Sequence, residues 1–229
     1  MLSRETFTFL LVIFGLILFS SCAHSKYVET RTRIGVIDTG VNYKAAPELK
    51  AYACAGGHLG LADSPFVDKY NHGTRVLRVL FKKLSSKKYC FIMVNYYNSI
   101  DSGWVNLARM IDGYKYLASQ NIKYLNVSSS GIDYSYNEYR YIDVLVKQKV
   151  YITVAAGNEG LKLDCELTKS YPNCYNFDRK YFRSISFGPS IYGRGNYGTN
   201  VDYIDPEFIG GASFNAPKYL GNWILELDK

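Results

Sequence analysis

Apolar and polar positions follow two patterns along this chain. Stretches that are apolar at almost every position are typical of strands buried on both faces of a parallel sheet, and they occur at residues 33–38, 89–96, 124–127 and 150–155, with shorter candidates at 52–55, 185–187 and 201–204. Stretches with apolar residues three or four apart predict helices at residues 72–84, from 107 onward, at 139–148 and at 213–225. The alternation predicts an α/β fold, a doubly wound and mostly parallel sheet with helices on both faces, in a single domain. Residues 160–180 fit neither pattern and read as an irregular loop.

The N-terminus differs from the rest of the chain. Arg4 precedes an apolar stretch at 7–19, which is shorter than the roughly 20 residues of a transmembrane helix and fits a signal peptide. Small residues and then Cys22 follow, a pattern that resembles the lipobox of bacterial lipoproteins, although Phe19 stands where Leu is usual. We therefore expect a signal peptide at 1–21, a lipidated Cys22 beginning a short tether at 22–32, and one folded domain at 33–229. Such a protein is exported to the bacterial cell envelope and held at the membrane by its lipid; simple secretion and an uncleaved anchor are the alternatives.

Composition and charge narrow the classes of function. Hydrophobic residues make up 48% of the chain and charged residues 21%, which is ordinary for a globular protein and argues against disorder. The formal charge is +7, but lysine and arginine are dispersed, with no basic run interleaved with aromatic residues. We therefore expect no nucleic acid partner.

Four cysteines remain after Cys22, and their even number behind an export signal predicts two disulfides. They are Cys54, Cys90, Cys165 and Cys174, which permit three pairings, and no CxxC spacing indicates zinc. Four free buried thiols are the alternative.

Four short motifs carry chemistry, each with an ordinary structural explanation beside it. Asp38 closes the first predicted strand and could cap a turn; the Asp-Thr-Gly that it begins is also an aspartic protease signature, but such sites need two carboxylates and this chain has one copy. His72 opens a helix, where histidine is usually a surface residue, but Gly73 beside it permits close approach. Asn158 follows a buried strand, as a turn residue or as a neutral donor for an oxyanion. Ser213 precedes the last helix, as an N-cap or as a nucleophile at a helix N-terminus.

The order of these residues decides between the readings. Asp, His, Asn and Ser, each at a strand end or helix start, match the order of the subtilisin triad. The chain resembles the subtilisin-like serine protease family in motifs that span residues 33–225, namely Ile37-Asp38-Thr39-Gly40-Val41, His72-Gly73-Thr74, Asn126-Val127-Ser128, Ala155-Ala156-Gly157-Asn158, Asn196-Tyr197-Gly198 with Val201-Asp202, and Gly211-Ala212-Ser213 with Ala216-Pro217.

The resemblance implies a serine endopeptidase that acts on peptide or protein substrates. Ser213 is then the nucleophile, His72 the general base and acid, Asp38 the residue that orients His72, and Asn158 an oxyanion donor. Two extended edges would bind substrate, formed by Ser128, Ser129, Ser130 and Gly131 and by Ala155, Ala156 and Gly157. The chemistry needs no metal or other cofactor; structural calcium is left open. The family-like sheet order also implies a Cys54–Cys90 disulfide, and the short loop a Cys165–Cys174 disulfide.

Several positions depart from the family pattern. Ala212 stands where Thr is usual, Ser129 and Ser130 replace a large apolar residue and a glycine, and the tether at 22–32 is too short for a folded prosegment. The runner-up function is therefore a catalytically weak or inactive protein of the same fold that binds peptides in the envelope. An α/β-hydrolase esterase is disfavoured, because that fold wants Gly-x-Ser-x-Gly and the order Ser, acid, His.

Overall fold

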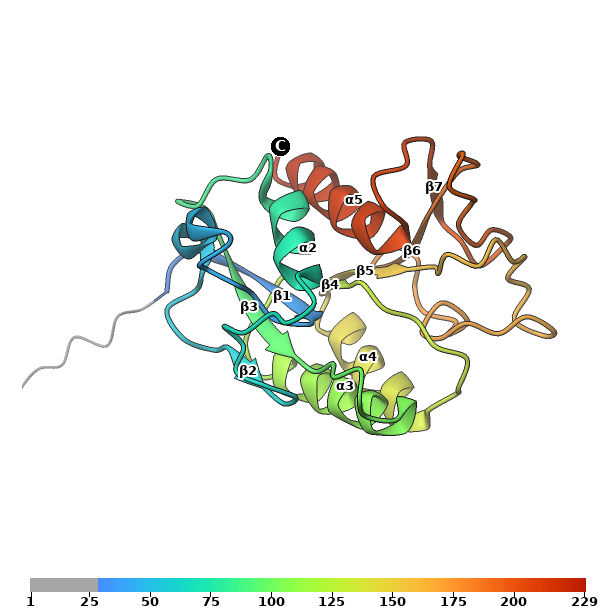
Figure 1. Cartoon of the computed structure of the whole chain (residues 1–229), viewed down its shortest axis with the longest axis horizontal. Coiled ribbons are helices and arrows are strands. Elements are labelled where there is room, and N and C mark those ends of the chain that lie inside the picture. Colours follow the sequence, from blue (N-terminus) through green and yellow to red (C-terminus); the bar gives the residue numbers. More distant parts are fainter. Residues whose placement is uncertain (1–28) are drawn as a thin grey trace, which may run out of the picture. The chain divides into compact units, whose positions relative to one another are not determined.

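The computed structural model describes residues 29–229, and the strands found among them form one sheet (Figure 1). Its order is β2-β3-β1-β4-β5-β6-β7, and every neighbouring pair runs parallel. The strands are β1 (Thr32–Asp38), β2 (Leu59–Gly60), β3 (Tyr89–Asn95), β4 (Tyr124–Val127), β5 (Tyr151–Ala155), β6 (Phe182–Phe187) and β7 (Tyr203–Asp205). The sheet is built outward from β1 in both directions, as in doubly wound folds.

Helices cover both faces of the sheet (Figure 1). The α-helices are α2 (His72–Phe81), α3 (Gly103–Leu117), α4 (Tyr136–Lys147) and α5 (Ala212–Leu227). Helices α2 and α5 pack together on one face, and α3 and α4 pack together on the other. Neighbouring strand residues point to opposite faces, so Val36 lies in the apolar layer under α2 and α5 while Ile37 lies in the layer under α3 and α4. The predicted fold class is confirmed.

The differences from the predicted elements are local. The strand expected at 52–55 is wrong: Tyr52 ends a 3-10 helix, η1 (Pro47–Tyr52), and only Ala53 makes a single bridge to β3. Strand β2 was not predicted because two residues carry no periodicity. Helices α3 and α4 begin earlier than expected, since Ser102 and Ser135 cap them by accepting backbone N–H groups with their side chains.

Two disulfides hold the loops, and they are the two pairs expected from the sequence. Cys54 is bonded to Cys90 in β3, which ties the segment after η1 to the sheet. Cys165 is bonded to Cys174 within the loop between β5 and β6.

The expected signal peptide and the lipidation of Cys22 lie outside the described residues. Among residues 29–229, no helix has the length and apolar character needed to span a bilayer.

Candidate active site

The carboxyl ends of three adjacent strands bring the candidate residues to one edge of the sheet. Asp38 is the last residue of β1, Ser128 follows β4, and Ala155 ends β5. Helices α2 and α5 begin with His72 and Ala212. In open parallel sheets this edge, beside the point where the strand order reverses, is where functional groups gather.

Asp38 and His72 form a hydrogen bond. The Nδ1 atom of His72 lies 2.8 Å from Oδ1 of Asp38, which also accepts the backbone N–H of Thr39 at 2.7 Å. Because a carboxylate oxygen accepts, Nδ1 carries the hydrogen and Nε2 is left free to accept a proton. The approach depends on Gly73, since a Cβ there would lie 2.3 Å from the carbonyl oxygen of Gly40. Asp38 is 3% exposed, so its carboxylate faces the imidazole with little water between them.

A second buried carboxylate, Asp68, supports this pair. Its Oδ2 accepts the backbone N–H of Thr74 at 2.8 Å, and its Oδ1 accepts the hydroxyl of Thr39 at 2.8 Å. The same Thr39 hydroxyl accepts the backbone N–H of Gly73. Asp68 thus joins the loop after Asp38 to the first turn of α2. Asp68 was not among the residues expected from the sequence. The one feature that could have drawn attention to it is that it is an acid four residues before His72.

The electrostatic surroundings favour a protonated His72. Burial of the ring lowers the pKa of His72, but the hydrogen bond that His72 donates to Asp38 and the negative charges of Asp38 and Asp68 outweigh burial and raise that pKa above its usual value. A raised pKa makes the imidazole a stronger base, which suits a group that must take a proton from an alcohol.

Ser213 lies in the first turn of α5, anchored to the segment after β4. Its Oγ donates to the carbonyl oxygen of Ser128 at 3.1 Å, and the Ser128 hydroxyl donates to the carbonyl oxygen of Ser213 at 2.7 Å. The Ser128 hydroxyl in turn accepts from the Asn126 amide at 2.8 Å, and Asn126 accepts from Thr153 at 3.2 Å. A buried polar chain therefore runs from β5 through β4 to the start of α5.

Packing places the start of α5 against the imidazole. The His72 ring lies 5.2 Å, centroid to centroid, from the ring of Phe214, the residue after Ser213. A cavity of about 340 Å³ opens here, lined by residues from β1, from α2 and from the segments before α2 and after β3 and β4: Asp38, Thr39, Tyr70, His72, Tyr96, Tyr97 and Ser128 among them. In this state the Ser213 hydroxyl faces the Ser128 carbonyl rather than His72.

Asn158 is exposed and lies beside the loop that leads to Ser213. Its Oδ1 accepts the backbone N–H of Ala212 at 2.8 Å. Gly211, at φ 116°, makes this approach possible, because a Cβ there would lie 2.8 Å from the same oxygen. With the oxygen engaged by Ala212, the amide N–H₂ of Asn158 is the end left to donate.

The two expected substrate edges differ in which backbone N–H and C=O groups already have hydrogen-bond partners within the protein. Gly131 exchanges both backbone hydrogen bonds with Tyr171, at 2.9 and 2.7 Å. In the other edge, the carbonyl oxygens of Ala155, Ala156 and Gly157 are taken by Asn173 or Asn196. In the first edge, Ser129 and Ser130 make no backbone–backbone hydrogen bond with another described residue.

The departure at Ala212 has a structural consequence. Ala212 is fully buried and packs with Ala155 and Phe187 in a small apolar cluster. The methyl group that stands in place of the usual threonine is thus accommodated by apolar packing.

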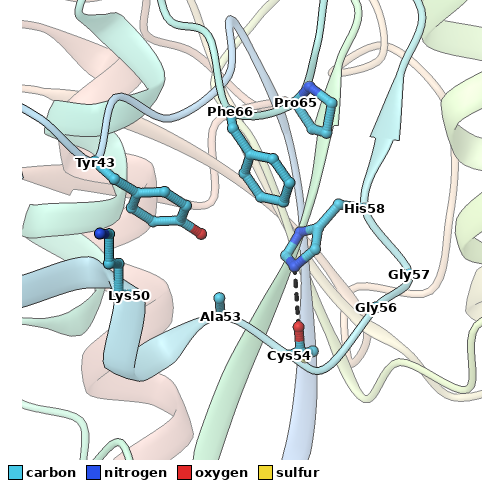
Figure 2. A pocket seen from close by; sticks show the side chains of 9 residues that line it. All are labelled: Tyr43, Lys50, Ala53, Cys54, Gly56, Gly57, His58, Pro65 and Phe66. Carbon is cyan, nitrogen blue, oxygen red and sulfur yellow. Dashed lines mark hydrogen bonds between the residues drawn. The ribbon is translucent and has the colours of Figure 1, made fainter. Parts of the chain in front are cut away.

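His58 serves a different part of the molecule. Its Nε2 donates to the carbonyl oxygen of Cys54 and its Nδ1 accepts the backbone N–H of Met93, both at 3.1 Å. It lines a cavity of about 440 Å³ with Tyr43 and Phe66 that shares no lining residue with the cavity at His72 (Figure 2). Both ring nitrogens are occupied, so His58 ties the segment after η1 to strand β3. His24 lies outside the described residues.

Within Arg31–Lys229, no three histidine, cysteine, aspartate or glutamate side chains gather closely enough to share a metal ion.

Several solved structures with the same architecture are proteases. A lanthipeptide protease aligns with a TM-score of 0.66 at 16% identity, covering 83% of this chain and 71% of that one. A cold-adapted subtilisin-like serine proteinase aligns with a TM-score of 0.66 at 22% identity, covering 89% and 79%. The chain has a subtilisin-like fold. The epidermin leader peptide processing serine protease from Staphylococcus aureus shares this subtilisin-like fold with a TM-score of 0.66 at 18% identity, covering 87% and 66%.

Sequence comparison alone does not reach this likeness: no protein-family model matches the chain, and no curated protein sequence does.

Proposed function

We propose that this subtilisin-like chain is a serine endopeptidase that hydrolyses peptide bonds through an acyl-enzyme intermediate. The observation that carries the proposal is the 2.8 Å hydrogen bond from His72 to the buried Asp38, beside a helix start that presents Ser213. An oriented imidazole next to a serine hydroxyl at a helix N-terminus is the arrangement that nucleophilic acyl transfer needs.

The proposed reaction has two halves. Ser213 Oγ attacks the carbonyl carbon of the substrate while its proton passes to Nε2 of His72, and the tetrahedral intermediate collapses as His72 gives that proton to the leaving amine. Water then attacks the acyl-enzyme with His72 again as base, and the acid product leaves Ser213 restored. Asp38 holds Nδ1–H and stabilises the charged imidazole, while the Asn158 amide and the backbone N–H of Ser213 receive the oxyanion.

The hydroxyl of Ser213 must turn from the Ser128 carbonyl to His72 for this reaction. A serine hydroxyl rotates about one bond, and hydrogen bonds between catalytic groups are often formed only when substrate binds. The same observation favours the second candidate function, an envelope protein of this fold that binds peptides with little or no turnover.

Peptide hydrolysis separates these two functions. The purified exported protein is incubated with a peptide library, and cleavage is read by mass spectrometry for the wild type, Ser213→Ala and the exposed control Ser119→Ala. We expect cleavage by the wild type and Ser119→Ala and none by Ser213→Ala. Peptide binding without cleavage in all three proteins would support the peptide-binding alternative.

We also propose the export route and domain division that the sequence indicates: a signal peptide at 1–21, lipid on Cys22, a tether at 22–32 and the peptidase domain at 33–229. Mass spectrometry of the mature N-terminus tests this directly. A lipidated Cys22 at the first position supports the anchor, and an N-terminus elsewhere contradicts it.

A further inference from the structure

A second cavity adjoins the free backbone edge at Ser129 and Ser130. It has a volume of about 280 Å³, and both serines line it. Tyr96 and Tyr97 line this cavity and also the one at His72, so the two are neighbours. A peptide laid along Ser129 and Ser130 on its way to His72 would therefore direct one of its side chains into this cavity.

The walls of this cavity are mostly apolar or aromatic, and one buried acid, Glu138, lines it. The walls come from the segment after β3, from α3 and from the loop between β5 and β6: Tyr96, Tyr97, Leu107, Met110 and Tyr171. Glu138, in the first turn of α4, is 1% exposed. Asp133 adds a second, exposed acid, and among the lining residues there is no lysine or arginine.

The Glu138 carboxylate does not cap the N-terminus of helix α4. Ser135 and Glu138 have the spacing of a capping box, in which the glutamate reaches back to the backbone N–H of the cap residue. Here the Ser135 N–H is directed instead to the hydroxyl of Tyr175, at 3.2 Å. Glu138 contributes only its own N–H, which donates to Ser135 Oγ. Its side chain is thus free of the helix terminus.

The carboxylate is only partly satisfied within the protein. Its Oε2 lies 2.8 Å from the Tyr175 hydroxyl, which also lies 3.0 Å from the carbonyl oxygen of Ser135 and has one hydrogen to give. Its Oε1 is buried and has no hydrogen-bond partner among the described residues. A buried carboxylate oxygen without a partner is costly, so this wall of the cavity favours a donor or a cation brought from outside.

The protonation behaviour of Glu138 agrees with this geometry. Burial raises the pKa of Glu138 to about 7, although the hydrogen bond from Tyr175 lowers it. The other ionisable groups around it are Tyr96, Tyr114 and Tyr175, whose pKa values burial raises, together with Tyr97, Tyr171 and the exposed Asp133 of the cavity wall. A cation bound in the cavity would favour the ionised form of Glu138 and so lower its pKa.

We propose that this cavity receives a lysine or arginine side chain of the peptide substrate and that Glu138 selects it. The inference rests on the proposed peptidase function and names its substrate class. The apolar walls suit the aliphatic stem of such a side chain, the tyrosine rings suit a cation over an aromatic face, and Glu138 supplies the counter-charge at the wall.

The test compares peptides that differ by one charge. Arginine is moved through each position of a cleaved peptide and compared with citrulline, which has nearly the same shape and no charge. At one position we expect kcat/KM for arginine to exceed that for citrulline roughly 10- to 100-fold, the range of a charge-assisted hydrogen bond. Glu138→Gln should bring the arginine-to-citrulline ratio of kcat/KM at that position close to one. Glu226→Gln, which removes an exposed charge on α5, should keep the preference.

The outcomes separate this inference from the proposed function. If the wild type cleaves peptides but treats arginine and citrulline alike at every position, or prefers an apolar residue, the inference is wrong and the peptidase stands. If no peptide is cleaved and a fluorophosphonate does not label Ser213, the proposed function fails. Should Glu138→Gln not fold, the arginine-to-citrulline ratio of the wild type at pH 6 and pH 8.5 decides. Protonation of Glu138 should reduce the ratio at pH 6, and a ratio independent of pH contradicts the role of Glu138; the titration of His72 cancels, because both peptides use it.

Discussion

The side-chain oxygen of Asn158 accepts the backbone N–H of Ala212 at 2.8 Å, immediately before Ser213. This bond sets which end of the amide faces away from the α5 loop. The carbonyl end is held by the protein, so the N–H₂ end is the one that can meet a developing negative charge.

Asn158→Ala should therefore reduce kcat with little change in KM. A single oxyanion donor of this kind in subtilisin is worth about 10²–10³ in kcat, and we expect a loss of that order here. Steady-state kinetics on one peptide substrate measure it, with Asn222→Ala in α5 as the matched control. A wild-type kcat in Asn158→Ala would remove Asn158 from the oxyanion site.

The second prediction concerns pH dependence and Asp68. His72 must be neutral to accept a proton, so activity should fall as pH drops through its raised pKa. Asp68→Asn removes a negative charge that raises this pKa, so the acidic limb of kcat/KM should move to lower pH. Asp63→Asn, which changes an acid paired with Lys69, should leave the limb in place. A limb unmoved in Asp68→Asn, or moved to higher pH, contradicts the electrostatic account.

The two disulfides should contribute unequally to stability. The chain-entropy model gives about 3 kcal/mol for the Cys165–Cys174 loop, with a sequence separation of 9, and about 4 kcal/mol for Cys54–Cys90, with a separation of 36. Double Cys→Ala variants of each pair, unfolded by urea, measure these losses. The reverse order would show that native-state packing, rather than loop closure, sets their value.

His58 should make the protein less stable in acid. Burial lowers the pKa of His58, so the folded state holds the neutral ring while the unfolded chain protonates near its usual pKa of about 6.5. Its contribution is present above that pH and is lost as pH falls toward the lowered folded-state pKa. The stability advantage of the wild type over His58→Gln should thus shrink between pH 7.5 and pH 5. A constant or growing difference in unfolding free energy would contradict this.

The sequence predicted the fold well for a physical reason. Strands buried on both faces leave uninterrupted apolar runs, and β1, β3 and β4 are buried along almost their whole length. The four candidate residues were found because each lies at a strand end or a helix start and because they follow one another in the order of the subtilisin triad. Strand β2 has two residues and so carried no such signal.

Two carboxylates show where sequence reasoning stopped. Asp68 and Glu138 lie just before the helices predicted at 72–84 and 139–148, and their local sequence does not show that folding will bury them. Asp68 becomes part of the site only when Thr39 and Thr74 come together across the fold. Glu138 becomes a cavity wall only because Tyr175, 37 residues away, takes the Ser135 N–H.

Covalent labelling of Ser213 is the most direct test of the central claim. The exported protein is treated with a fluorophosphonate, which reacts with a serine hydroxyl activated by a neighbouring base, and its intact mass is measured. We predict one added phosphonyl group per chain on Ser213 in the wild type, none in Ser213→Ala, and greatly slowed labelling in His72→Ala. An unlabelled wild type, or equal labelling of the wild type and His72→Ala, would contradict the account of an Asp38-His72-Ser213 triad.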